Sequence, residues 1–227
     1  MKLHIHAGIR AVAAVTAGYL LGNVPSADLA ARFSGGPDSD NQDLRCVGSA
    51  NPGALNVGQT LGKKWGAAVF AADVLKGTGA AAIGRACAGP AGANFAATAA
   101  VAGHCFPMGT RTGGKGVSTS IGQVLGTFPY YLPLDIAVGA ATAALPLWTQ
   151  RTWAATGTAS AVWISSAALA YRRGWPTGID RRAPLSLPLA AALSSAIIAR
   201  RFRDTPLVDG KPTNPQGVGN DEGLDAP

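Results

Sequence analysis

Three long stretches without a charged residue limit most strongly what this chain can fold into. They are residues 86–110, 152–171 and 183–199, and each approaches or exceeds the roughly 17–25 residues that a membrane-spanning helix needs. Three further stretches contain only one or two charges: 11–31, 65–84 and 131–150. The pattern predicts an all-α fold, a polytopic transmembrane bundle of about six to seven helices, some of them short, such as one at 117–129.

The composition agrees with this prediction once its small residues are considered. Hydrophobic residues make up 48% of the chain and charged residues 14%, yet the mean hydropathy is only +0.19. Alanine and glycine dominate the apolar content, and they score weakly while still allowing close helix packing in lipid. We expect residues 1–203 to form one membrane-embedded domain and the polar tail, 204–227, to be disordered.

The net charge of +7 restricts the choice of partner. The basic residues flank apolar segments and form no stripe with interleaved aromatic residues, so we expect anionic membrane lipids as a partner and no nucleic acid. The three cysteines are odd in number and widely spaced, which predicts neither a disulfide framework nor a metal site. No pattern in the chain indicates an organic cofactor.

The N-terminal segment has two interpretations. Lys2 and Arg10 precede an apolar stretch, as in a secretory signal or an uncleaved anchor. The apolar pattern runs on to Phe33, however, which favours one long helix over about 8–33. Pro25 removes a helical hydrogen bond and is expected to kink that helix, so that Asn23 and Ser26 face a polar cavity. The alternative for Ser26 is a bond to its own backbone.

Two glycine-rich loops between apolar segments are candidate anion sites. In the first, residues 48–56, we expect Gly48 and Gly53 to adopt positive φ and to direct successive N–H groups at one anion. The alternative is a structural turn. The second is Gly113-Gly114-Lys115-Gly116. It differs from a nucleotide P-loop because glycine follows the lysine and no strand precedes it, so the pattern favours phosphate without a nucleotide.

Several polar residues lie inside or beside the apolar segments. Asp73 and Lys76 are three positions apart on one helical face and can neutralise each other, as a functional or a structural pair. His104 precedes the second loop and is a candidate proton acceptor or a packing residue. Arginines also cluster at 172–182 and at 200–203. Arginine clusters beside membrane spans normally lie on the cytoplasmic side, but a single predicted span separates these two clusters and puts them on opposite sides. We therefore expect one of the clusters to be misplaced or functional.

Five motifs together resemble the bacterial acyl-phosphate-dependent glycerol-3-phosphate acyltransferases, the PlsY family of polytopic membrane enzymes. In chain order they are Leu-Gly-Asn-Val-Pro-Ser at 21–26, Gly-Ser-x-Asn-x-Gly-Ala-x-Asn-Val at 48–57 with Leu-Gly-Lys-Lys at 61–64, Asp-x-x-Lys-Gly at 73–77, Gly-His-x-Phe-Pro at 103–107, and Gly-Gly-Lys-Gly-Val-x-Thr at 113–119. They cover about 19–122 in unbroken order, which makes the set far more specific than any one motif.

The resemblance implies transfer of an acyl group from acyl phosphate to the sn-1 hydroxyl of glycerol 3-phosphate in a bacterial inner membrane, with the site loops on the cytoplasmic side. It implies acyl phosphate, glycerol 3-phosphate and membrane lipids as partners. The implied catalytic residues are Ser49, His104 and Lys115. The implied substrate-binding residues are Asn51, Gly53, Asn56, Gly113, Gly114, Gly116 and Ser118.

The chain departs from the family pattern at two places. The first motif has Leu55 and Gln59 where threonine and arginine are usual. The third motif, His-Arg-x-Asn followed by Gly-x-Glu, is replaced by Arg-Arg-Phe-Arg at 200–203 and Gly-Lys-Pro at 210–212. These departures leave a second hypothesis, a non-catalytic relative that binds a phosphorylated lipid precursor or regulates a partner. The helix count with Asp73 and Lys76 leaves a third, a small-molecule transporter.

Overall fold

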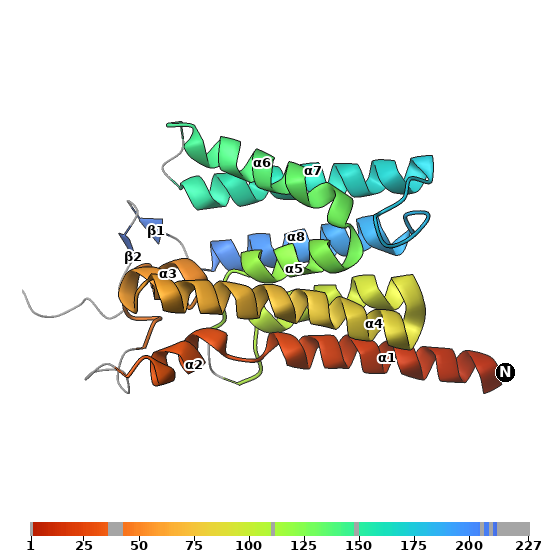
Figure 1. The fold of residues 1–227 in the computed structure, drawn as a ribbon, viewed down its shortest axis with the longest axis horizontal. Coiled ribbons are helices and arrows are strands. Elements are labelled where there is room, and N and C mark those ends of the chain that lie inside the picture. Colours follow the sequence, from red (N-terminus) through yellow and green to blue (C-terminus); the bar gives the residue numbers. More distant parts are fainter. Residues whose placement is uncertain are drawn as a thin grey trace, which may run out of the picture.

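The computed structural model describes residues 2–35, 43–109, 112–147, 150–204, 207–208 and 211–212. Apart from two two-residue strands near the C-terminus, the chain within these residues is a helical bundle, as the sequence predicts. Figure 1 shows α6 and α7 on one side, α5 and α8 in the middle, and α1 to α4 on the other side. The helices are α1 (Lys2–Gly22), α2 (Ser26–Phe33), α3 (Ala54–Thr60), α4 (Lys63–Cys105), α5 (Val117–Thr127), α6 (Leu132–Ala144), α7 (Arg151–Arg173) and α8 (Ser186–Arg203), with a 3-10 turn η1 (Pro129–Tyr131) before α6.

The longest element, α4, is a helical hairpin. Ala88 and Gly89 leave the helical conformation, Gly89 with φ 64°, and Pro90 follows them. The two limbs then pack backbone to backbone, because a Cβ on Gly84 would lie 2.2 Å from the carbonyl oxygen of Gly92. The hairpin thus joins the two apolar stretches 65–84 and 86–110, and it returns the chain so that the end of the second limb lies beside the middle of the first.

The first apolar segment breaks where proline predicts it. Helix α1 ends at Gly22 and α2 begins at Ser26, since Pro25 has no N–H to continue the helical ladder. A break inside an apolar segment leaves carbonyl groups without helical partners, and these need other donors. The ammonium group of Lys76 supplies one, at 2.6 Å from the carbonyl oxygen of Val24.

Within the described residues, two segments are long and apolar enough to cross a membrane, His6–Phe33 and Lys63–Cys105, and the second of these is the hairpin. A third qualifies if α5 and α6, bent by 119° at η1, are taken as one broken span. Helices α7 and α8 lie where spans were predicted at 152–171 and 183–199 but do not meet this criterion. Each of the six predicted stretches contains a helix or one limb of the hairpin.

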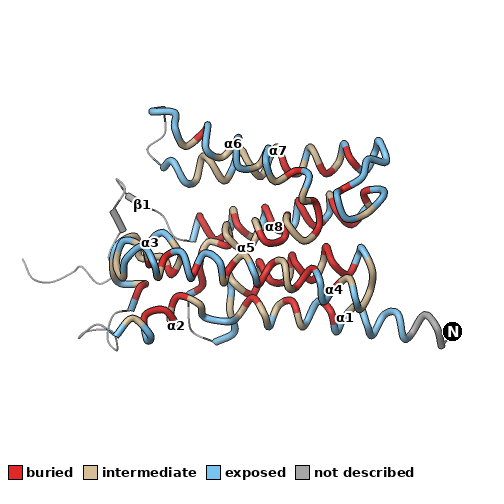
Figure 2. Tube along the Cα trace, viewed as in Figure 1, coloured by how far each residue is buried: buried red, intermediate tan, exposed pale blue. Residues whose placement is uncertain are grey.

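The helices approach each other closely because the contacting residues are small. Figure 2 shows buried residues concentrated where α4, α5 and α8 face one another. Helix α1 lies against the second limb of α4 through Gly18 and Gly22, where a Cβ would come within 2.2 Å of the carbonyl oxygens of Ala96 and Ala100. Small residues four positions apart are the usual means of close packing between helices in lipid.

The C-terminal tail was predicted to be disordered from residue 204. Asp204 caps α8, and two short strands, β1 (Leu207–Val208) and β2 (Lys211–Pro212), pair in an antiparallel arrangement. Residues 205–206, 209–210 and 213–227 lie outside the described residues. Disorder of this tail therefore stays a prediction.

The close approach of α1 to α4 predicts opposite effects for two glycines of α1. Gly18→Ala should destabilise the protein by about 1–3 kcal/mol, because its Cβ has no room against Ala96. Gly8→Ala is the matched control, since nothing lies within 4 Å of its Cβ, and alanine favours a helix over glycine. Thermal unfolding in detergent measures both. Equal melting temperatures for the two variants would contradict the packing.

Candidate functional site

Asn56 organises the first glycine-rich loop from inside. Its side chain is 1% exposed; its Oδ1 accepts the N–H of Ser49 at 2.9 Å, and its Nδ2 donates to the carbonyl oxygens of Leu44 and Val47, both at 3.0 Å. The amide thus bonds only to loop backbone. Both polar atoms of the side chain thus already have partners near the loop, and a direct substrate contact of Asn56 stays a prediction.

The backbone of this loop differs from prediction at one position. Gly48 has φ +60°, as expected, and a Cβ there would lie 2.1 Å from Oδ1 of Asn56. The second positive φ is at Ala50, at 50°, whereas Gly53 has φ −124° and caps the start of α3. The prediction of a positive φ at Gly53 was therefore wrong. Gly53 instead leaves room for the side chain of Asn51, whose Nδ2 would lie 2.7 Å from a Cβ at position 53.

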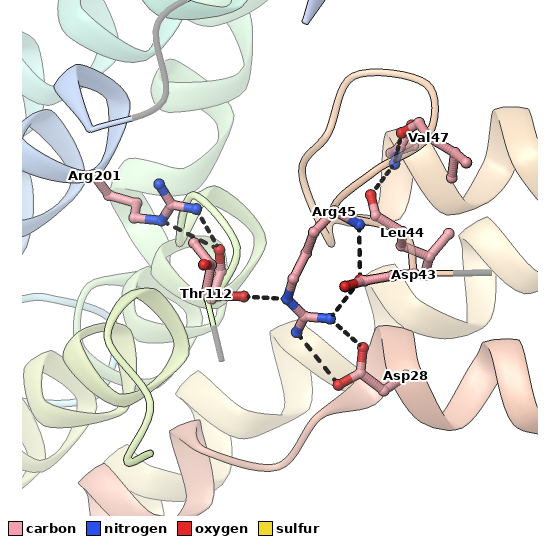
Figure 3. A network of polar contacts seen from close by, with 9 residues as sticks. Asp28, Asp43, Leu44, Arg45, Val47, Thr112 and Arg201 are labelled. Atoms are coloured by element: carbon pink, nitrogen blue, oxygen red, sulfur yellow. Dashed lines mark hydrogen bonds and ion pairs between the residues drawn. The ribbon is translucent and has the colours of Figure 1, made fainter. Parts of the chain in front are cut away.

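Two arginines hold the second loop from either side (Figure 3). Arg45, which precedes the first loop, donates to the carbonyl oxygen of Thr112 at 2.8 Å, and Arg201, from α8, donates to that of Gly113 at 2.7 and 3.2 Å. The two peptide groups that flank Gly113 are therefore fixed, and the planarity of each peptide also fixes the directions of the N–H groups of Gly113 and Gly114.

Arg45 is itself fixed by carboxylates. Its Nη1 lies 2.9 Å from Asp28 and 3.1 Å from Asp43, which joins α2 to both loops. Arg201 is 1% exposed. Because a buried guanidinium group is strongly destabilising without partners, its two bonds to Gly113 explain why it can lie here.

The two loops meet at His104, and glycine makes the meeting possible. A Cβ on Gly114 would lie 2.3 Å from Nε2 of His104 and 3.2 Å from the carbonyl oxygen of Pro52 in the first loop. A Cβ on Gly113 would lie 2.1 Å from the carbonyl oxygen of His104. Any other residue at these two positions would push the second loop away from the imidazole.

Two cavities flank His104, and among the described residues it is the one that lines both of them. The first is a polar cleft of about 330 Å³ at the break between α1 and α2, where Asn23 and Ser26 face the predicted polar cavity. The cleft is also lined by the charged residues Asp28, Arg45 and Lys76 and by two glycines, Gly113 and Gly114. The second is a more apolar groove of about 610 Å³ between α3, α4 and α5. Its apolar walls include Ala67, Phe70, Val117 and Ile121.

The polar end of the groove gathers five of the predicted residues. Asn51, Gly53, Lys115, Gly116 and Ser118 all line it. Oδ1 of Asn51 is buried and has no hydrogen-bond partner within the described part of the chain, so a ligand can supply one. Gly116, with φ +81°, caps the start of α5 and places the groove at that helix's N-terminus, where backbone N–H groups favour anions. Ser49 is half-buried and lines neither cavity.

Lys115 rests on an aromatic pair. Its Nζ lies 4.6 Å from the ring centroid of Phe202, which in turn lies 4.9 Å from the ring of Trp153. Burial, and then the positive charge of Arg201, lower the pKa of Lys115. The ammonium group is therefore less stable without an anion than that of an exposed lysine, which suits a position that a phosphate occupies.

A buried ionic cluster lies behind His104. Nζ of Lys76 lies 2.8 Å from Oδ1 of Asp73, so the pairing predicted from their spacing is confirmed. Ser26 donates its hydroxyl to the same carboxylate oxygen at 2.5 Å, and Nδ1 of His104 lies 3.6 Å from it. The cluster connects the broken first segment to both limbs of α4.

The sequence analysis missed Arg201, Phe202 and Trp153 as parts of the site. The arginine cluster at 200–203 carried a signal, since one cluster was expected to be functional. In the structure Arg200 and Arg203 are exposed and Arg201 is buried, while the arginines at 172, 173, 181 and 182 are all exposed. Apart from their aromatic side chains, no sequence feature of Trp153 and Phe202 indicated that they belong to the site. Residues 110 and 111 of the second loop lie outside the described residues.

These features define a helical membrane protein in which a polar cleft and a more apolar groove meet at His104. Comparison with known proteins agrees with this class. The family model described as glycerol-3-phosphate acyltransferase matches residues 12–205. The chain belongs to this glycerol-3-phosphate acyltransferase family.

Individual relatives and structures show how far the likeness extends. A glycerol-3-phosphate acyltransferase of Nitrobacter winogradskyi is 44% identical in a match that covers 49% of this chain and 55% of the relative. A glycerol-3-phosphate acyltransferase of Thermoanaerobacter is 40% identical in a match that covers 53% of this chain and 59% of the relative. The chain thus matches little more than half the length of these relatives. The crystal structure of PlsY, an integral membrane glycerol 3-phosphate acyltransferase, in its glycerol 3-phosphate form is 31% identical with a TM-score of 0.68, covering 86% of this chain and 88% of that one. The crystal structure of PlsY in its lysophosphatidic acid form is 29% identical to this chain, with a TM-score of 0.65.

The contrast between the two asparagines of the first loop is testable. Asn56→Ala leaves two carbonyl groups and one N–H of the loop without partners, which should lower the free energy of unfolding by about 1–3 kcal/mol. Asn51→Ala removes an amide whose Oδ1 has no partner in the described chain and should leave stability within about 0.5 kcal/mol. Thermal unfolding in detergent distinguishes them, and an equal loss in both variants would refute the assignment.

Proposed function

We propose that this protein transfers an acyl group from acyl phosphate to the sn-1 hydroxyl of glycerol 3-phosphate, yielding lysophosphatidate and phosphate at a bacterial inner membrane. The observation that carries the proposal is the position of His104 in the wall between a polar cleft and an apolar groove. One cavity suits a small phosphorylated polyol and the other an acyl chain with a charged head. Family membership supports the same reaction.

The apolar groove is the site for acyl phosphate. Its walls along α4 and α5 accept the acyl chain, and its polar end places Lys115, Asn51 and Ser118 around the phosphate. Lys115 neutralises the charge that grows on the leaving phosphate, which is the interaction that lowers the barrier most in such transfers. The N-terminus of α5 adds backbone donors to the same end of the groove.

The polar cleft is the site for glycerol 3-phosphate. Gly113 and Gly114 line it, and Arg45 and Arg201 fix the two peptide groups that flank Gly113. Arg45 adds a positive charge to the lining. The second loop thus contacts both substrates, through its glycines on one side and Lys115 on the other. The cytoplasm supplies glycerol 3-phosphate, so we place the loops on the cytoplasmic side.

The substrate hydroxyl then lies against Nε2 of His104. A neutral imidazole can take the proton as the oxygen attacks the acyl carbon. Asn56 and Ser49 contribute by shaping the first loop, since the side chain of Asn56 bonds to Ser49 and to loop carbonyls. The two cavities share one wall, so the acceptor and the donor meet without free diffusion between sites.

One observation favours a second candidate, a non-catalytic relative that binds a phosphorylated lipid precursor. Gln59 lines the groove at the position where the first family motif has arginine, so one positive charge is missing beside Lys115 and Lys63. Such a relative would be stabilised by glycerol 3-phosphate in thermal unfolding without forming product. The activity assay below separates the two functions.

The decisive test of the reaction is product formation by the detergent-purified protein with acyl phosphate and labelled glycerol 3-phosphate. Lys115→Ala should raise the KM for acyl phosphate about 10- to 100-fold, the loss expected for a hydrogen bond to a charged group. Lys64→Ala is the matched control, because Lys64 is exposed and lines neither cavity. Absence of lysophosphatidate from folded wild-type protein would exclude the proposed reaction.

The lowered pKa of Lys115 predicts a pH effect on substrate affinity. Lysine is charged below its pKa, so the KM for acyl phosphate should rise as the pH increases through a value below the ordinary lysine pKa of about 10.4. Lys115→Arg stays charged throughout this range. Its KM should therefore stay flat where that of the wild type rises. Parallel profiles for the two proteins would show that another group titrates.

A further inference from the structure

The arginine cluster between α7 and α8 has no part in the site described so far. It consists of Arg172 and Arg173 at the end of α7 and of Arg181 and Arg182 in the loop before α8. All four side chains are exposed, and within the described residues none of them has a hydrogen bond or an ion pair. Figure 1 shows the loop at the end of the bundle opposite α2 and α3. These charges therefore lie on the face away from the two cavities.

The α7–α8 loop, residues 174–185, is held in one conformation by its own backbone. The hydroxyl of Thr177, which is fully buried, accepts the N–H of Asp180 at 2.9 Å. The N–H of Ala183 donates to the carbonyl oxygen of Trp175 at 2.8 Å. This second bond brings the later part of the loop back beside the end of α7, so both pairs of arginines lie in one area.

The loop is also tied to the rest of the bundle. Asp180 accepts two hydrogen bonds from Arg85 of α4, at 2.6 and 3.1 Å, so its charge is neutralised and does not offset the arginine cluster. Arg85 lies just before the hairpin turn at Ala88, inside a segment apolar enough to cross a membrane. The turn of such a hairpin lies at a membrane surface, and the loop tied to it lies there too.

Two structural explanations of the cluster are incomplete. Basic residues in the last turn of a helix are stabilised by its dipole, which accounts for Arg172 and Arg173 but not for Arg181 and Arg182, because these two lie outside the helices. Arginines beside spans also favour the cytoplasmic side. The 18 residues of α8, about 27 Å, separate this cluster from the one at 200–203, so that preference cannot explain both.

The apolar neighbours of the cluster indicate what partner it fits. Trp175, Ile179 and Leu185 of the same loop are 48%, 44% and 54% exposed. Large apolar side chains beside basic ones are typical of segments at a membrane interface, where the apolar groups enter the lipid and the charged groups reach the headgroups. A guanidinium group also forms paired hydrogen bonds to phosphate oxygens. An acidic protein segment would match the charges but leave the apolar side chains unexplained.

We propose that the α7–α8 loop is a docking site for an anionic phospholipid, whose phosphate group is bound by Arg181 and Arg182. Arg172 and Arg173 add positive charge beside it, which outweighs the one negative charge that Asp135 adds in the first turn of α6. The lipid belongs to the leaflet opposite the two cavities, so it does not compete with their ligands. The site goes beyond acyl transfer and does not depend on it.

Thermal unfolding of the detergent-purified protein with added phosphatidylglycerol tests the site. Phosphatidylglycerol should raise the melting temperature of the wild type, whereas phosphatidylcholine, which has no net charge, should not. Arg181→Gln/Arg182→Gln should weaken the apparent affinity for phosphatidylglycerol about 25-fold, or about fivefold for each arginine near anionic lipid. Its melting temperature without lipid should equal that of the wild type, because neither side chain has a partner in the described chain.

Arg32→Gln/Lys64→Gln is the matched control, since it removes two exposed charges at the end of the bundle where α2 and α3 lie. Its affinity for phosphatidylglycerol should stay within about threefold of the wild type. An equal loss in the two double variants would overturn the proposal. A wild type that responds equally to the two lipids would also overturn it, in favour of an acidic protein segment as the partner.

Asp180→Asn separates a preformed site from general attraction between charges. It makes the protein more positive by one charge, so general attraction predicts tighter binding of phosphatidylglycerol. It also removes the ion pair with Arg85 that holds the loop, so a preformed site predicts weaker binding, although all four arginines of the cluster remain. Binding by Asp180→Asn that is as tight as in the wild type, or tighter, would overturn the proposal.

Discussion

The site depends on two guanidinium groups that hold neighbouring carbonyl oxygens of one loop. Arg45 bonds to Thr112 and Arg201 to Gly113, and peptide planarity then fixes the N–H group on the other side of each of these peptides. Arg45 is tied in turn to Asp28 of α2. Elements distant in sequence thus hold the same two peptide groups of one loop.

Close backbone contacts make this arrangement compact. At Gly113 and Gly114 a side chain would overlap His104, and at Gly103 it would overlap the backbone of α1 at Tyr19. Helices in lipid gain little from burying apolar surface and associate mainly through such contacts. Glycines thus serve both contacts, since Gly103 lets α1 approach α4 while Gly113 and Gly114 let the second loop approach His104.

The sequence predicted what is local and periodic. Charge-free stretches placed the helices, Pro25 placed the break, and the spacing of Asp73 and Lys76 predicted their contact. It could not predict partners brought together by the tertiary fold. Arg201 bonds to a carbonyl group 88 positions away, and no periodicity marks which arginine of a cluster turns inward. Asn56 carried a motif that indicates a ligand contact, but its partners are loop carbonyls whose positions depend on the left-handed conformation at Ala50.

The break in the first segment explains why charged groups can lie at this depth. Pro25 interrupts the helical ladder and frees the carbonyl of Val24, which attracts the ammonium group of Lys76. A lysine in an apolar segment requires a counter-charge, and Asp73, one helical turn earlier, supplies it. The hairpin turn at Ala88 and Gly89 then brings His104 beside that carboxylate. One proline and one helical turn thus place a carboxylate and an imidazole side by side at the wall of the groove.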